Sequence, residues 1–159
     1  MKRIFVLVAT VALSLVASGV LLAQNDAFVG TWKLNVAKSK FTGTPAPKSE
    51  TRTVVAQGNG LKVTYEGIAA DGSPISYGLT TNLDGKDSAF SGAGPFGADT
   101  VAVTRVDAST ITSIAKKAGK TILTTRTVVS KDGKVTTQTV KGTNEQGQPM
   151  SYTTVWDKQ

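Results

Sequence analysis

The chain has 159 residues and a formal net charge of +7, from 18 Lys and Arg residues against 11 Asp and Glu residues. It contains no Cys and no His, which excludes disulfides, cysteine nucleophiles, the usual zinc ligands and histidine acid–base chemistry. The basic residues are scattered, whereas nucleic-acid grooves combine clustered Arg and Lys with aromatic platforms. We therefore expect no catalytic residues, no metal, no cofactor and no nucleic-acid partner.

Residues 1–23 have the pattern of a secretory signal peptide. A positive start at Lys2 and Arg3 is followed by an uncharged apolar run, and Ala23 stands before polar residues. We expect cleavage after Ala23, export to the periplasm or the extracellular space, and no stable membrane insertion afterwards. Residues 24–159 then form one domain with 16 basic and 11 acidic residues, a net charge of +5. An uncleaved anchor is the alternative, because an apolar run of about 19 residues can span a membrane.

The domain that follows is rich in Val and Thr, which favour β-strands, and it shows no helical period. Turn signals built from Gly, Asp and Asn recur at regular intervals, which predicts hairpins in an antiparallel meander. We expect an all-β, up-and-down barrel of 8–10 strands. The expected strands are 28–36, 50–57, 61–68, 75–81, 86–91, 100–106, 110–116, 120–130, 134–143 and 149–157.

Alternation of apolar and polar residues predicts which face of each strand points inward. On the first strand Trp32, Leu34 and Val36 share one face, and the opposite face is polar. An outer-membrane barrel would need an apolar exterior, so we expect a sheet closed around its own apolar face. The corresponding inward residues on later strands are Leu61, Val63, Tyr65, Ile75, Tyr77, Leu79, Met150, Tyr152 and Trp156.

Two segments of the chain recur almost in step. Residues 51–55 read Thr-Arg-Thr-Val-Val and are repeated at 125–129, an offset of 74. Residues 72–77, Gly-Ser-Pro-Ile-Ser-Tyr, are answered by Gly-Gln-Pro-Met-Ser-Tyr at 147–152, an offset of 75. We interpret this as an internal duplication of a unit made of strand, hairpin, strand, turn and strand.

The repeat places Arg52 and Arg126 at equivalent points of its two copies. An inward arginine could bind a carboxylate or phosphate with two hydrogen bonds. The sequence does not decide the face, because Val54 and Val55 are adjacent and both apolar. An unpaired inward arginine is too costly in a dry core, so it would imply a wet cavity or an anion.

The segment Phe28-Val-Gly-Thr-Trp-Lys-Leu-Asn35 resembles the opening of lipocalins and fatty-acid-binding proteins, the calycin group. The ending Val155-Trp-Asp-Lys158 is similar to the last strand of fatty-acid-binding proteins. This resemblance implies a barrel with a ligand cavity and Trp32 as the plug of its closed end. The whole chain more closely resembles a group of small exported bacterial proteins of uncharacterised function that share the Gly-Thr-Trp-Lys-Leu-Asn start.

Two features depart from the fatty-acid-binding pattern. That family places a lid of two short helices after the first strand, but here residues 37–49 are few and contain Pro45 and Pro47, so no helix pair fits. The family also places a carboxylate-binding arginine two residues before the final aromatic, where this chain has Thr154. The anion site of that family therefore does not carry over by position.

We predict an exported lipocalin-like protein, not an enzyme, that binds a small lipophilic or amphipathic ligand inside the barrel. The alternative is a barrel with a packed interior that acts as a structural or protein- or glycan-binding module through its surface, because eight-stranded barrels are often filled by their own side chains. The sequence leaves the ligand, the portal and the oligomeric state open. The candidate ligand-binding residues are Arg52, Tyr65, Tyr77, Leu79, Arg126, Met150, Tyr152 and Trp156.

Overall fold

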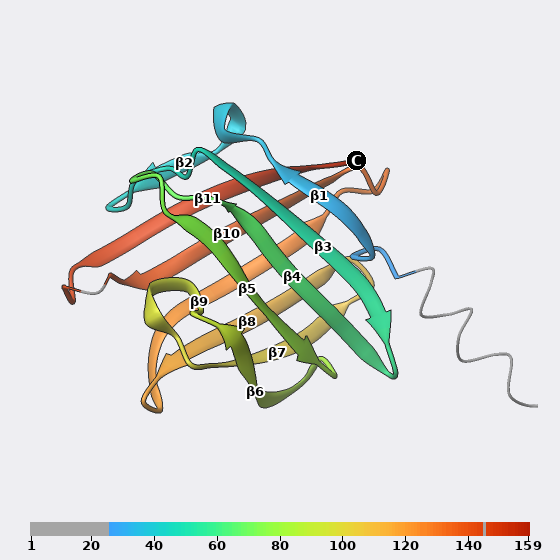
Figure 1. Ribbon diagram of the computed structural model, residues 1–159. Helices are drawn as coiled ribbons and strands as arrows, with labels where there is room; N and C mark the ends of the chain where they lie inside the picture. Colours follow the sequence, from blue (N-terminus) through green and yellow to red (C-terminus); the bar gives the residue numbers. More distant parts are fainter. Residues whose placement is uncertain (1–25, 145) are drawn as a thin grey trace, which may run out of the picture.

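A computed structural model describes residues 26–144 and 146–159, so the predicted signal peptide lies outside the described residues. The strands form one antiparallel sheet that closes into a barrel (Figure 1). The elements are β1 (Gly30–Leu34), η1 (Val36–Lys38), β2 (Lys40–Thr42), β3 (Ser49–Gln57), β4 (Gly60–Ile68), β5 (Pro74–Thr81), β6 (Asp84–Gly92), η2 (Pro95–Gly97), β7 (Thr100–Asp107), β8 (Thr110–Lys117), β9 (Lys120–Val129), β10 (Val135–Thr143) and β11 (Pro149–Lys158).

The barrel closes at β1, which pairs with β3 on one side and with β11 on the other. Trp32 has Arg52 as its partner on β3 and Lys158 as its partner on β11. The ring therefore contains ten strands, β1 and β3 to β11, in meander order. This confirms the predicted all-β antiparallel barrel.

The chain between β1 and β3 differs from the expectation in detail. We expected the first strand to continue to Val36, but it ends at Leu34, and Val36 begins the single-turn helix η1 and is 37% exposed. Asn35 causes this ending, because its side chain accepts a hydrogen bond from the backbone N–H of Lys38 and caps the turn. The short strand β2 was not predicted. It pairs with β11 at Ser151 to Thr153, next to the part of β11 that pairs with β1. As the two prolines predict, no helix pair forms in residues 37–49.

One end of the barrel, on the right in Figure 1, is filled by apolar side chains. Trp32 is fully buried there, and its Nε1 donates a hydrogen bond to the carbonyl of Phe28 at 2.9 Å. Arg105 forms an ion pair with Asp26 and stands 5.4 Å from the centre of the Phe28 ring, so it holds the segment before β1 across this end. The cluster consists of Phe28, Trp32, Leu34, Val54, Leu61, Val129 and Trp156.

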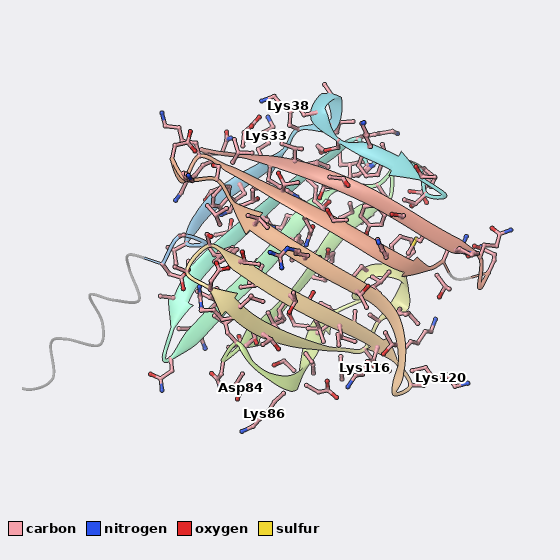
Figure 2. The ribbon with its side chains drawn as sticks, turned by 180° about the vertical axis from the view of Figure 1, so that it is seen from behind. Lys33, Lys38, Asp84, Lys86, Lys116 and Lys120 are labelled. Carbon is pink, nitrogen blue, oxygen red and sulfur yellow. The ribbon has the colours of Figure 1, made fainter. Side chains whose placement is uncertain are left out.

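Charged side chains cover the outside of the barrel. Figure 2 shows Lys33, Lys38 and Lys120 on the outer surface. Lys38 pairs with Asp157 at 3.4 Å; exposed pairs of this kind contribute about 0–1 kcal/mol each. The polar exterior and apolar interior agree with the alternation of the sequence. Within the described part of the chain, no helix has both the length and the apolar character needed to cross a membrane.

The repeated segments fall on β3–β5 and β9–β11, but the two arginines do not point the same way. Arg52 is buried inside the barrel with 4% exposure, whereas Arg126 is exposed on the outside. Their offset is 74 rather than 75, and a shift of one residue along a strand moves a side chain to the other face. The inward counterpart of Arg52 is therefore Thr127, which is 3% exposed, and the expected equivalence of the two arginines is wrong.

Candidate functional site

A cavity with a volume of about 870 Å³ lies inside the barrel. Small-molecule sites in proteins commonly occupy about 300–1,000 Å³. The cavity extends to the end opposite Trp32, because the loop residues Pro45, Asp71 and Phe96 contribute to its lining. Beyond the apolar cluster at the closed end, the barrel interior is therefore not filled by its own side chains, whereas the alternative prediction assumed a packed interior.

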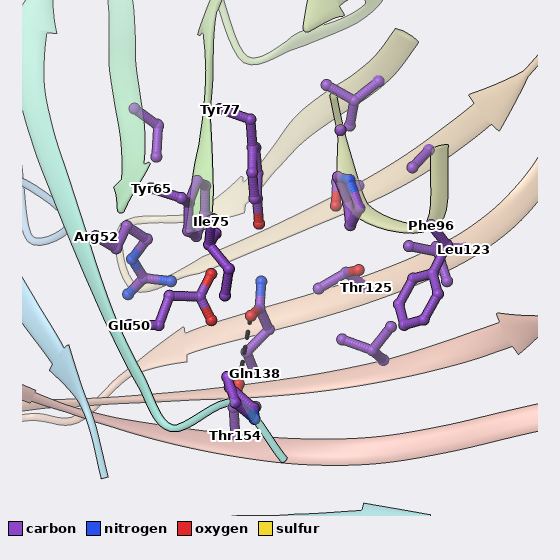
Figure 3. A pocket seen from close by; sticks show the side chains of 18 of the residues that line it. Glu50, Arg52, Tyr65, Ile75, Tyr77, Phe96, Leu123, Thr125, Gln138 and Thr154 are labelled. Carbon is purple, nitrogen blue, oxygen red and sulfur yellow. Dashed lines mark hydrogen bonds between the residues drawn. The ribbon is translucent and has the colours of Figure 1, made fainter. Parts of the chain in front are cut away.

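Two charged residues, Glu50 and Arg52, enter the cavity from β3. They are two residues apart, so the alternation of a strand places both side chains on the inner face. The two-residue turn between β3 and β4 sets Arg52 directly opposite Tyr65, and Tyr65 is opposite Tyr77 on β5. Figure 3 shows these side chains and Gln138 of β10 projecting into the same space. The site thus combines one cation, one carboxyl group and several neutral hydrogen-bonding groups.

Arg52 lies at the deep side of this group, next to the apolar cluster. Its guanidinium carbon is 4.8 Å from the ring centre of Trp156 and 5.7 Å from that of Trp32, which is the geometry of cation–π contacts. Nη2 donates a hydrogen bond to the hydroxyl of Thr136 at 2.6 Å. Its buried Nε has no hydrogen-bond partner among the residues that the structure describes. A buried cation on the wall of a cavity is suited to a ligand that brings an acceptor or a negative charge to its guanidinium.

The positive charge of Arg52 is only partly balanced by negative charge in the cavity. In the described part of the chain, Arg52 forms no ion pair within 4.0 Å of a carboxylate oxygen. Burial raises the pKa of Glu50 from its ordinary 4.5 to about 7, although Arg52 and a hydrogen bond with Tyr77 act in the opposite direction. At neutral pH the Glu50 side chain is therefore close to half protonated, and the cavity carries a net positive charge near Arg52.

Aromatic side chains form much of the remaining wall. The rings of Tyr65 and Tyr77 stack with centres 4.6 Å apart, and Phe90 meets Tyr77 edge-on at 5.9 Å. Nearer the open end, Tyr152 lies between Phe41 at 6.0 Å and Phe96 at 6.4 Å. Burial raises the pKa of all three tyrosines, so their hydroxyl groups stay neutral and available as hydrogen-bond donors. This wall presents flat apolar surfaces with polar tips.

A short chain of hydrogen bonds joins the wall to the base of the cavity. Nε1 of Trp156 donates to the hydroxyl of Thr154 at 2.9 Å, and that hydroxyl donates to the side-chain oxygen of Gln138 at 3.4 Å. Thr154 stands where the fatty-acid-binding pattern has its arginine, so this position contributes a neutral hydroxyl. The only cation lining the cavity within residues 26–144 and 146–159 is Arg52 of β3.

The structure brings together most of the residues predicted from the sequence. Those that line the cavity are Arg52, Tyr65, Tyr77, Leu79, Tyr152 and Trp156. Arg126 is exposed on the outer face of β9, so it is not part of the site. Met150 points inward but is buried in an apolar cluster with Leu123 and Val140 and does not line the cavity. Trp32 lies in the apolar cluster at the closed end.

Sequence reasoning missed several lining residues. Glu50 is the most important of them. It lies two residues before Arg52 on the same strand, so its inward direction could have been predicted once the face of Arg52 was known. Gln138 and Thr125 face the cavity from β10 and β9, but polar residues gave no apolar pattern to detect. Phe90 and Phe96 lie beside glycine-rich segments where alternation is interrupted.

Comparisons with known proteins bear on the fold. No protein-family model and no curated protein sequence matches this chain. Among solved structures, the chain is similar to the ileal bile acid-binding protein of zebrafish, crystallised in complex with cholic acid, with a TM-score of 0.53 and 16% sequence identity over 84% of this chain and 99% of that one. It also aligns with lobster apocrustacyanin A1 with a TM-score of 0.45 and 12% identity over 85% of this chain, and spans 62% of the length of that protein.

The first of these likenesses, together with the closed ten-stranded ring, shows that this chain has a calycin-type fold. The resemblance inferred from the Gly-x-Trp motif is thereby confirmed at the level of the fold. At 16% identity the likeness extends no further than the arrangement of the strands.

Proposed function

We propose that this protein binds one small amphipathic molecule inside the barrel, with the polar end of the ligand at Arg52. The observation that carries the proposal is a buried arginine, without a carboxylate partner within 4.0 Å in the described part of the chain, that lines a cavity of about 870 Å³. Burying an unpaired cation costs free energy, and a ligand acceptor placed there would recover part of that cost. The stacked tyrosines and the aliphatic side chains offer an apolar surface for the rest of the ligand.

The ligand class receives support from the similar fold. The zebrafish structure was crystallised with cholic acid, an amphipathic molecule, and this chain has a similar fold with a cavity that combines apolar walls and the charged Arg52. We infer binding rather than catalysis, because the sequence has no His or Cys and the described cavity offers Glu50 as its one carboxyl group near Arg52. The alternative role at the barrel surface assumed a packed interior, and the cavity of about 870 Å³ does not support that assumption.

We also propose that binding takes place after export. The support is the signal pattern of residues 1–23, followed by a domain whose first described residues already belong to the closed end of the barrel. The mass of the exported protein tests this proposal. A chain that begins at Gln24 supports cleavage, and one that keeps its first residues supports the anchor.

A fluorescent fatty acid with an environment-sensitive group tests the proposed function. We expect saturable binding of one probe per chain, with a change in tryptophan emission because Trp156 lines the cavity. Ser113→Phe places a large side chain in the cavity and should weaken binding by at least about tenfold, or about 1.4 kcal/mol. The neighbouring Ile114→Phe is the matched control, because Ile114 is 42% exposed on the outside.

Equal affinity in the native protein and both variants would place the probe outside the barrel. Absence of saturable binding to the folded native protein would reject the proposed function.

A further inference from the structure

We infer that the polar end of the ligand is a monoanion and that Glu50 takes up a proton when this anion binds beside Arg52. Glu50 then acts as a specificity-determining residue, since its protonation state decides whether the site accepts a negative charge. The inference rests on the proposed function, because it concerns the same cavity.

Strand β3 places Glu50 and Arg52 at different depths of the cavity. Glu50 is the second residue of β3 and lies toward the open end, while Arg52 lies deeper, against Trp156. An anion that approaches the guanidinium of Arg52 from the cavity comes close to the Glu50 carboxyl group, because both side chains line the cavity from the inner face of β3, two residues apart. A second negative charge beside Glu50 in this buried site disfavours the ionised form of its carboxyl group, so the bound anion raises the pKa of Glu50 further and favours uptake of a proton.

Protonation of Glu50 favours binding of the anion. An ionised Glu50 would offset the charge of Arg52 and repel a second anion. A protonated Glu50 leaves the charge of Arg52 available and adds an O–H donor of its own. The ligand then receives a charge-assisted hydrogen bond from Arg52 and a neutral one from Glu50, which is a stronger combination than either alone.

Among the groups that surround it, Glu50 is the one that changes its protonation state near neutral pH. Arg52, on the same strand, is the cation of the site. Burial raises the pKa of Tyr65 on β4, Tyr77 on β5 and Tyr152 on β11, so these three hydroxyl groups stay neutral. Phe41 of β2 and Gln138 of β10 do not titrate. At the open end, hydrogen bonds from Ser73 hold the pKa of Asp71 below its ordinary value, with a smaller contribution from Lys48, so Asp71 stays ionised. The sequence contains no His.

The direction of the pH dependence follows. Below the pKa of about 7, free Glu50 is already protonated and the affinity for an anion is constant and high. Above it, each binding event must bring a proton, so the affinity falls by up to about tenfold per pH unit until the higher pKa of the bound state is passed. A neutral ligand would show little change, and a cationic ligand would bind more tightly as the pH rises.

Calorimetry with decanesulfonate tests this inference, because that probe stays anionic at every pH used. Titrations at pH 6.0 and pH 8.5, each in two buffers of different ionisation enthalpy, give the affinity and the number of protons taken up. We expect the affinity to fall at least about fivefold between the two pH values, with net proton uptake at the higher pH. In Glu50→Gln the change should be less than about twofold, and Glu66→Gln should behave like the native protein, since Glu66 is exposed on β4.

Decanol and decyltrimethylammonium separate the two proposals. Saturable binding of decanol together with no binding of decanesulfonate, or decanesulfonate binding without proton uptake, overturns the inference and leaves the proposed function intact. Binding of decyltrimethylammonium alone contradicts both proposals, because this cation brings no acceptor to Arg52. Absence of saturable binding by all three probes overturns both. A pH dependence that persists unchanged in Glu50→Gln also overturns the assignment to Glu50.

Discussion

Trp32→Ala is expected to lower the free energy of unfolding by about 3–5 kcal/mol, the range found for removal of large buried aromatic side chains. Trp32 is fully buried, and its indole N–H donates to the carbonyl of Phe28, which would be left without this partner. The ring also faces the guanidinium of Arg52 and the ammonium of Lys158, at 5.7 and 5.0 Å. The loss is a large share of the total stability of a small domain, which is about 5–15 kcal/mol.

Urea unfolding followed by circular dichroism measures this effect without relying on the fluorescence of the deleted residue. Trp32→Phe is a milder second variant, in which the ring remains but the hydrogen bond to Phe28 is lost, so its loss should be smaller than that of the alanine variant. A loss below about 1 kcal/mol in Trp32→Ala would contradict the role of this residue in the closed end of the barrel.

Arg52→Met is expected to weaken the binding of decanesulfonate by at least about 30-fold, or about 2 kcal/mol, while Arg126→Met changes it less than about twofold. The two arginines share the same local sequence, Thr-Arg-Thr-Val-Val, but Arg52 lines the cavity and Arg126 is exposed. Methionine fills a similar volume, and replacing a buried charge by an apolar side chain is often neutral for stability. The variant should therefore stay folded.

The matched pair separates a local charge from the general positive charge of the protein. Both variants lose one positive charge, so an effect of overall charge would weaken binding equally in both. Equal losses, or unchanged affinity in Arg52→Met, would contradict the assignment of the polar end of the ligand to Arg52. The affinity of decanol, measured in parallel, should change little because it carries no charge.

The barrel could be predicted from the sequence because alternation and turn signals agree along most of the chain. Ten expected strands correspond to observed ones, and inward residues such as Tyr65, Tyr77 and Tyr152 were placed on the correct face. The direction of Arg52 was left open by the sequence and is set by the register of β3 and β4. A two-residue turn at Gly58 and Asn59 sets Arg52 opposite Tyr65, and residues directly opposite on paired strands share a face.

Other features depend on interactions that the sequence pattern does not express. The strand β2 is three residues long and exists through its pairing with β11, far away in the sequence. The cavity depends on the summed size of side chains from many strands, which no local pattern records. The raised pKa of Glu50 likewise depends on burial by the closed barrel.

The most direct test of binding inside the barrel is a set of intermolecular nuclear Overhauser effects between decanesulfonate and the methyl groups of the protein. Interior methyl groups of Leu79 and Val101 line the cavity, whereas Val106 and Ile114 are 54% and 42% exposed on the outside. We expect contacts from the alkyl chain to Leu79 and Val101 at one probe per protein, and none to Val106 or Ile114. Contacts confined to the exterior methyl groups would contradict the account, because the probe would then bind the surface of the barrel.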